Sequence, residues 1–145
     1  MSIYETENFV LEAHSKPEID RLEGGHVTIS PKEELVDRTE LSPMLAIELM
    51  RFTIVAGKAM VAGMKTRGVD IGRINYQENG NWKPQLHIHL YCRAKTATMQ
   101  KYGEPITPGH KPEFHPLNED DIAAVRREVE RLFATLDFSN EEWGL

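Results

Sequence analysis

The chain has 145 residues, a length typical of one domain, and 40% of them are hydrophobic, which is enough to build a buried core. Its 23 acidic residues outnumber its 17 basic residues, and the net charge of −6 argues against a protein that binds long DNA or RNA through a basic surface. The single cysteine excludes an internal disulfide and favours the reducing cytoplasm, while a small phosphorylated ligand remains compatible with this composition.

No segment has the features of a membrane or export signal. The N-terminal residues lack the basic and apolar regions of a signal peptide. The most apolar long segment, residues 43–64, contains three charged residues, which are Glu48, Arg51 and Lys58. We therefore expect a single cytoplasmic domain over residues 1–145, with neither a membrane nor a nucleic acid polymer as its partner.

Two short strands are predicted first, at residues 8–14 and 26–30, and a Gly-Gly turn precedes the second. Apolar and polar side chains alternate in the second strand. Val27 and Ile29 therefore face one side of it and His26 faces the other.

A long helix is predicted over residues 42–66, with Ser42 as its N-cap and Pro43 at its first position. Its apolar residues lie on most sides, so a sheet alone would not cover them. We expect a second copy of the chain to cover the remaining face, which predicts a homodimer that packs through this helix.

Two more strands are predicted at residues 69–77 and 85–93, joined by a loop with Asn-Gly turn chemistry. A long loop with several Gly and Pro residues follows at 95–117, and loops of this length in a compact domain are often functional. The last helix spans residues 118–136, with Asn118 as its N-cap. Strands grouped around one long helix, with another helix at the end, indicate an α+β domain with a mostly antiparallel sheet.

The stretch QLHIHLYCR, residues 85–93, carries two histidines in a strand-like setting. Side chains alternate along a strand, which predicts an apolar face of Leu86, Ile88, Leu90 and Cys92 and a polar face of Gln85, His87, His89, Tyr91 and Arg93. The two histidines stand roughly 6–7 Å apart, close enough to act on one phosphate-sized group. Imidazole can ligate a metal, transfer a proton or attack as a nucleophile.

A metal site at these histidines would need further ligands. A cupin-like site would place a carboxylate three or four residues after His89, where Arg93 and its neighbours stand instead. His110 and His115 in the long loop are the remaining candidates, and nothing in the spacing requires them. A phosphoesterase with two His-x-Thr/Ser motifs is also a poor match, because only HVT at 26–28 fits. We expect no metal and no other cofactor.

The stretch QLHIHLYCR resembles the signature of the histidine triad (HIT) family, His-φ-His-φ-His-φ-φ, where φ is an apolar residue. Upstream, GGHVTISPKE is similar to the family's Gly-His strand and Pro-Lys segment, and INYQENGN is similar to the strand and turn before its triad. The segments occur in the family's order from about residue 8 to residue 95. The resemblance implies a HIT-like α+β fold, a homodimer through the long helix, and a nucleotide as the small-molecule ligand.

The resemblance also implies a reaction at the α-phosphate of a nucleotide, such as a dinucleoside polyphosphate or a nucleoside phosphoramidate, by hydrolysis or nucleotidyl transfer. The middle histidine of the family triad attacks phosphorus and forms a nucleotidyl-histidine, and this role carries over to His87. His89 takes the third position, and Gln85 stands in the first, where most members have histidine. Glutamine can orient a neighbour by hydrogen bonding but carries no proton at neutral pH. The expected catalytic residues are thus His87, His89 and Gln85.

Further contacts with the ligand are expected from residues near the triad. Asn75 is expected to contact ribose or phosphate, and Asn81 and Trp82 lie just upstream of the triad, near the phosphates. His26 is expected to line the pocket, and the two histidines of the long loop are candidates to close over it.

Two other functions remain open at this point. One is a nucleotide-binding protein of the same fold whose catalysis is weakened by Gln85. The other is a metal-binding protein that uses His87 and His89.

Overall fold

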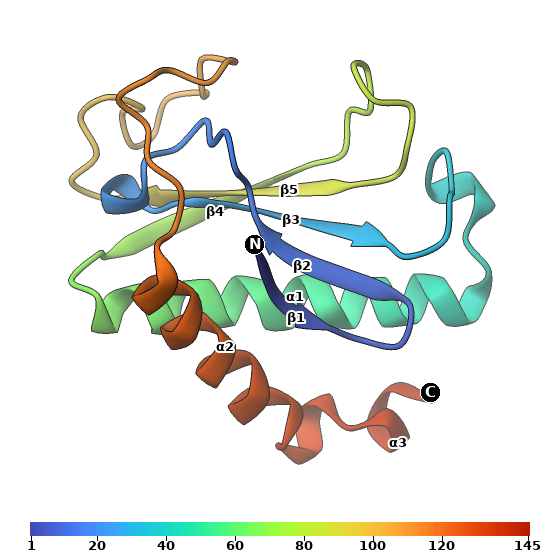
Figure 1. The fold of residues 1–145 in the computed structure, drawn as a ribbon. Helices are drawn as coiled ribbons and strands as arrows, with labels where there is room; N and C mark the ends of the chain where they lie inside the picture. Colours follow the sequence, from blue (N-terminus) through green and yellow to red (C-terminus); the bar gives the residue numbers. More distant parts are fainter.

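Five antiparallel strands organise the computed structural model, which covers residues 1–145 (Figure 1). Across the sheet they are β1 (Ser2–Glu5), β2 (Phe9–Ala13), β3 (His26–Pro31), β5 (Ile88–Ala94) and β4 (Ile71–Gln77). The long helix α1 (Pro43–Thr66) connects β3 to β4, and β5 lies between these two strands. The strand that carries His89 therefore lies inside the sheet, and the predicted α+β class with an antiparallel sheet is confirmed.

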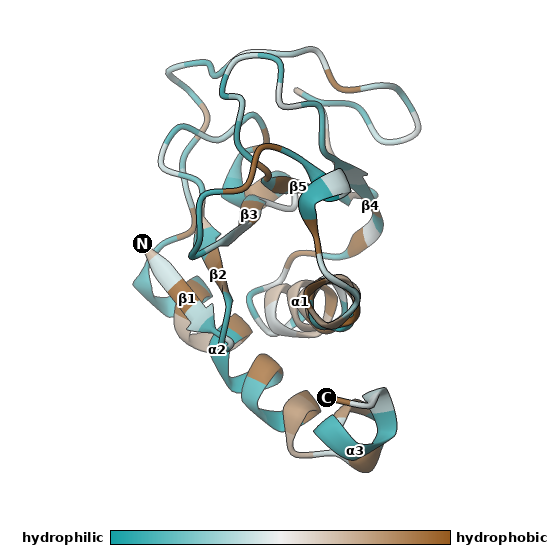
Figure 2. Ribbon diagram, turned by 90° about the vertical axis from the view of Figure 1, so that its right-hand side faces the viewer, coloured by the Kyte–Doolittle hydropathy of each residue, from teal (hydrophilic) through white to brown (hydrophobic).

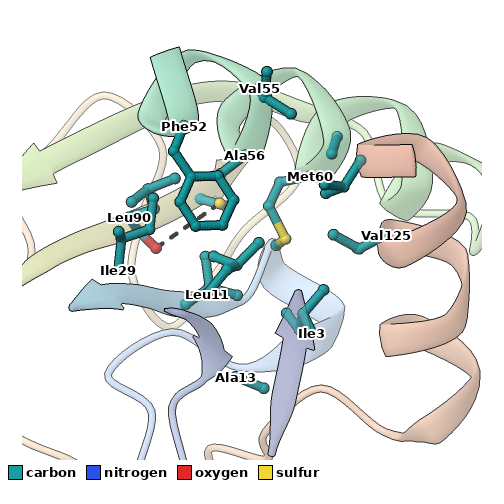
Figure 3. Packing of buried hydrophobic residues seen from close by; sticks show 14 of the residues in the cluster. Ile3, Leu11, Ala13, Ile29, Phe52, Val55, Ala56, Met60, Leu90 and Val125 are labelled. Carbon is teal, nitrogen blue, oxygen red and sulfur yellow. Dashed lines mark hydrogen bonds between the residues drawn. The ribbon is translucent and has the colours of Figure 1, made fainter. Parts of the chain in front are cut away.

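Helix α1 covers one face of the sheet and begins at the predicted cap. The Ser42 hydroxyl accepts a hydrogen bond from the Leu45 N–H, and Pro43 occupies the first turn, where its missing N–H costs nothing. Buried apolar side chains of α1 and of the strands meet in one core (Figure 3); they include Phe52, Ala56, Met60, Leu11, Ile29 and Leu90. Their removal from water drives the helix onto the sheet.

The second helix, α2 (Glu119–Phe133), packs mainly against α1 and also contacts β1. Its N-terminus is a capping box formed by Asn118 and Asp121. Asp121 is fully buried, and its carboxylate pairs with Arg21 and Arg67 from two other parts of the chain. The chain ends with the short helix α3 (Asn140–Trp143), and no helix combines the length and apolarity that a membrane crossing requires.

The opposite face of the sheet is covered by loops. Figure 2 shows α1 end-on at one side of β3, β4 and β5, and the long connections at the other side. The alternation predicted for the histidine-bearing strands is confirmed on the core side, because Val27, Leu90 and Cys92 are buried against α1. Their neighbours Thr28 and His89 face the loops, so this loop-covered side holds the polar groups.

Several elements differ from the prediction, and the strand expected at 69–77 begins at Ile71. Strand β1 was not predicted. The strand expected at 85–93 begins at Ile88, because the residues before it bond to loops: the Leu86 N–H donates to the Leu35 carbonyl. The helix expected at 118–136 ends at Phe133, where the chain passes into a 3-10 turn (Leu136–Phe138).

Candidate active site

A cleft of about 830 Å³ opens on the face of the sheet opposite α1. Strands β2 to β5 contribute its floor, the connection between β4 and β5 forms one wall, and the long loop after β5 forms another. The lining includes Ser30, Asn75, Trp82, His87, His89 and Pro105. Its side chains are mostly polar, which suits a charged or strongly hydrogen-bonding ligand.

A chain of hydrogen bonds determines which ring nitrogen of His89, a residue that lines this cleft, carries the proton. The Glu18 N–H donates to Nδ1 of His26 at 3.1 Å, so the proton of the neutral His26 ring must sit on Nε2. That nitrogen lies 2.8 Å from Nδ1 of His89 and donates to it. His89 must then carry its own proton on Nε2. The Glu18 amide, acting through His26, thus leaves the Nε2–H group of His89 as a free hydrogen-bond donor.

Electrostatics agree with these neutral tautomers. Burial lowers the pKa of His26 to about 2, and the neighbouring rings of His14 and His89 lower it in the same direction. Burial also lowers the pKa of His89 to about 4, with further contributions from His87 and His14. Both rings are therefore neutral at pH 7, and the relay from His26 to His89 persists under those conditions.

His87 lies beside His89, with ring centroids 4.8 Å apart and the ring planes at 76°. Its Nδ1 lies 2.7 Å from the backbone carbonyl oxygen of Gln85. A carbonyl can only accept, so Nδ1 carries the proton and donates to it. Nε2 of the neutral ring is then left with its lone pair, which is the state that a nucleophilic histidine requires.

Gln85 differs from its expected place on the polar strand face. Its side chain lines two smaller depressions next to His87, whereas the lining of the main cleft does not include it. The reason is that β5 begins only at Ile88, so the strand alternation does not extend back to Gln85. The contact that orients His87 comes from the Gln85 backbone, which a residue of any type could supply.

The other predicted contacts separate into two groups. Asn75, Asn81 and Trp82 all line the cleft, and Trp82 is fully exposed at its edge. His26 lies on the same face of the sheet as His89 but is completely buried and does not line the cleft; it acts on the cleft only through His89. It is therefore a supporting residue, although the sequence predicted a lining one.

His14 is a cleft residue that the sequence did not single out. Its ring stacks on His26 with centroids 4.3 Å apart and planes only 8° from parallel. Its Nδ1 accepts a hydrogen bond from the Lys16 N–H at 3.2 Å, and burial lowers its pKa. The available signal was its position just after β2, because pairing of Ala13 with Val27 brings it beside His26.

Comparison with known proteins shows the family of the chain. The family model described as the HIT domain matches residues 1–96. The chain belongs to the HIT family. No relative was found among curated proteins.

Solved structures extend the likeness to most of this HIT protein. A histidine triad protein from Bradyrhizobium japonicum is 18% identical with a TM-score of 0.66, over 89% of this chain and 90% of that chain. A hypothetical histidine triad nucleotide-binding protein from Sulfolobus tokodaii is 20% identical with a TM-score of 0.62, over 93% of this chain and 87% of that chain. A zinc-bound histidine triad family protein from Mycobacterium smegmatis is 18% identical with a TM-score of 0.56, over 90% of this chain and 84% of that chain. These similarities support the HIT fold.

The long loop of this HIT protein holds its two histidines away from the cleft. Nδ1 of His110 lies 2.7 Å from the Pro17 carbonyl oxygen, and the His115 N–H donates to the Asp20 carboxylate at 2.7 Å. Neither histidine lines the cleft, so the expectation that they close over it does not match the structure. Both instead attach the loop to the segment between β2 and β3.

The histidine cluster of this HIT protein does not fit a metal centre well. His14, His26 and His89 have ring nitrogens within 4.8 Å of one another. Metal ligation requires in-plane lone pairs that converge on one point, whereas the rings of His14 and His26 are nearly parallel. Both nitrogens of His26 already make hydrogen bonds. The cluster is therefore better suited to hydrogen bonding than to ligation.

Proposed function

We propose that this HIT domain is a nucleotide hydrolase or nucleotidyl transferase that acts at the α-phosphate of a dinucleoside polyphosphate or a nucleoside phosphoramidate. The observation that carries the proposal is the pairing of His87 with the Gln85 carbonyl, which leaves Nε2 of His87 as a free nucleophile in a polar cleft. The acidic net charge of −6 favours a small nucleotide over a polymer. A cytoplasmic location remains our prediction from the single cysteine, Cys92, which is unpaired and buried.

In the proposed first step, Nε2 of His87 forms a bond to phosphorus while the bond to the leaving group breaks. The leaving group departs with the electron pair and takes its proton from solvent. The positive charge that develops on the His87 ring is stabilised by the bond from Nδ1–H to the Gln85 carbonyl. In the second step, water or another phosphate attacks the same phosphorus and releases His87.

His89 would stabilise the charge on the phosphate oxygens. Its Nε2–H is the free donor of the relay that starts at the Glu18 amide. A fixed donor in a partly buried site stabilises a developing anion without reorganising water. Because the backbone carbonyl of Gln85 orients the nucleophile, the glutamine side chain gives no reason to prefer the binding-only alternative.

The adduct on His87 is the direct test. The protein would be incubated separately with diadenosine tetraphosphate and with adenosine 5′-phosphoramidate, and its intact mass would be measured without acid, because a P–N bond is acid-labile. We expect an added adenylyl group that maps to His87 and is absent in His87→Ala. His110→Ala, which removes a histidine outside the cleft, should keep the adduct. Tight nucleotide binding with neither adduct nor mononucleotide release would contradict the proposed reaction.

We also propose that the protein is a homodimer that packs through α1. An apolar stripe runs along the exposed side of the helix, formed by Ile47, Met50, Ile54 and Val61. It continues onto Tyr76 of the edge strand β4, and side chains of this size are costly to leave in water. Light scattering should give the mass of a dimer for the wild type and of a monomer for Val61→Asp. Arg127→Asp, on the exposed side of α2 and away from the stripe, controls for the added charge, and a monomeric wild type would refute the proposal.

A further inference from the structure

Arg93 lies two residues beyond Tyr91 on β5, yet it is only 3% exposed, because the segment after β5 folds over it. Its Nη2 donates to three backbone oxygens of that segment, at 3.3, 2.9 and 2.9 Å, from Gln100, Lys101 and Glu104. Its Nη1 donates to Oδ1 of Asn75 at 2.8 Å. One guanidinium therefore joins a cleft residue on β4 to the loop that forms a wall of the cleft.

A second buried charge completes the attachment of this loop. Although burial alone would raise the pKa of Glu23, hydrogen bonds to its carboxylate hold that pKa below its ordinary value; the donors are the N–H groups of Thr98, Gln100 and Met99. The side chain of Gln100 bonds to both the N–H and the carbonyl of Thr107. Pro105 and Ile106, which line the cleft, are thereby held in place.

The bond from Arg93 also decides which end of the Asn75 amide faces the cleft. A guanidinium has donors and no acceptor, so the amide oxygen of Asn75 must point toward it. The Nδ2 group is then left to point away from Arg93, toward the cleft that Asn75 lines. An amide free to rotate could instead present its oxygen, which repels the oxygens of a phosphate.

We propose that Arg93 is a positioning residue, which makes Asn75 a hydrogen-bond donor to the ligand and attaches the loop wall to the same point. The inference rests on the proposed function for the identity of the ligand, a nucleotide with phosphate and sugar oxygens that accept hydrogen bonds. Arg93 does not itself touch the ligand. Its effect on binding passes through Asn75 and through the segment from residue 98 to residue 107.

A double-mutant cycle on AMP binding, measured by calorimetry, tests this role. The proteins are the wild type, Asn75→Ala, Arg93→Lys and the double variant. Each single substitution should raise the Kd for AMP about tenfold or more, because a hydrogen bond to an anionic ligand is lost or misdirected. The Kd of the double variant should be only slightly above that of the single variant that binds AMP more weakly, because both changes remove the same hydrogen bond from Asn75 to the ligand. If the Kd of the double variant rises by the product of the two single-variant increases, the two residues act independently and the proposal is overturned.

Two further variants separate positioning from folding. Asn75→Asp keeps oxygens that accept from Arg93 but has no N–H groups, so it should lose AMP binding while amide hydrogen exchange in residues 98–107 stays slow. Unchanged AMP binding by this variant would also overturn the proposal, even if Arg93→Lys fails to fold. Arg127→Lys, on the exposed side of α2, should leave the Kd unchanged. A wild type that binds no AMP would instead show that the proposed function is wrong, and the inference would fall with it.

Discussion

The buried histidine His26 should make the protein sensitive to mild acid. In the folded protein its pKa is lowered to about 2, whereas a histidine in an unfolded chain titrates near 6.5. As the pH falls below about 6.5, the unfolded chain binds a proton at this residue and the folded chain does not. The unfolded state is therefore favoured progressively as the pH falls from 7 toward 2.

The magnitude follows from the two pKa values. Between pH 7 and pH 5 the unfolded histidine becomes almost fully protonated, and integration of the proton difference gives a loss of about 2 kcal/mol from His26 alone. His89 acts in the same direction, but its ring is partly exposed and solvent screening reduces its contribution. A loss of about 2 kcal/mol is a large share of the stability of a small domain.

Urea denaturation at pH 7 and pH 5, at one protein concentration, would measure this loss for the wild type and for His26→Gln. Glutamine at this position can still hydrogen-bond but does not titrate. The wild type should lose about 2 kcal/mol more than His26→Gln over this pH interval. His110→Gln, which removes an exposed histidine, should behave as the wild type does. Equal losses in the wild type and in His26→Gln would refute the assignment of a buried, neutral His26.

Other predictions concern single residues. Gln85→Ala should change turnover no more than about twofold, because the hydrogen bond that orients His87 comes from the backbone of Gln85, whereas His89→Ala should lower it roughly a hundredfold in the same assay. A large loss in Gln85→Ala would restore a catalytic role to the glutamine side chain. Gly24→Ala should destabilise the fold by more than about 3 kcal/mol in urea titration, because φ is +130° and a Cβ would lie 1.8 Å from the Cys92 carbonyl oxygen. Gly68→Ala, with φ of +83° and open space around it, should cost only about 1–2 kcal/mol, and equal costs would contradict the argument.

Local sequence features predicted most of the secondary structure. The limits of α1 were predicted well, since Ser42 and Pro43 specify a helix start through contacts within one turn. The core side of β5 was also predicted, because alternation needs only neighbouring residues. Strand β1 was missed, since it is short and is stabilised by pairing with β2 and by the Arg126 side chain, which donates to the Ser2 and Ile3 carbonyls.

The family motif located His87 and His89 but did not show how they are held. The QLHIHLYCR pattern implies a regular strand, whereas the chain reaches β5 only at Ile88, after its preceding residues have bonded to loops. The orienting group for His87 is thus a backbone carbonyl, which no side-chain pattern reports. Arg93 is a similar case. The alternation of side chains along the strand placed it on the polar face but could not show that a loop buries it.

The sequence by itself determined the α+β class, the main helices and the two central histidines, because these follow from contacts between residues close together in the chain or from a short motif. Tertiary structure decided the chemistry around them. His26 and His89 are 63 residues apart and meet only through the register of β3 with β5, in which Thr28 lies opposite His89. His14 joins them only because β2 pairs with β3. Register between distant strands is set by the packing of the whole sheet on α1, and it is this packing that turns separate histidines into one site.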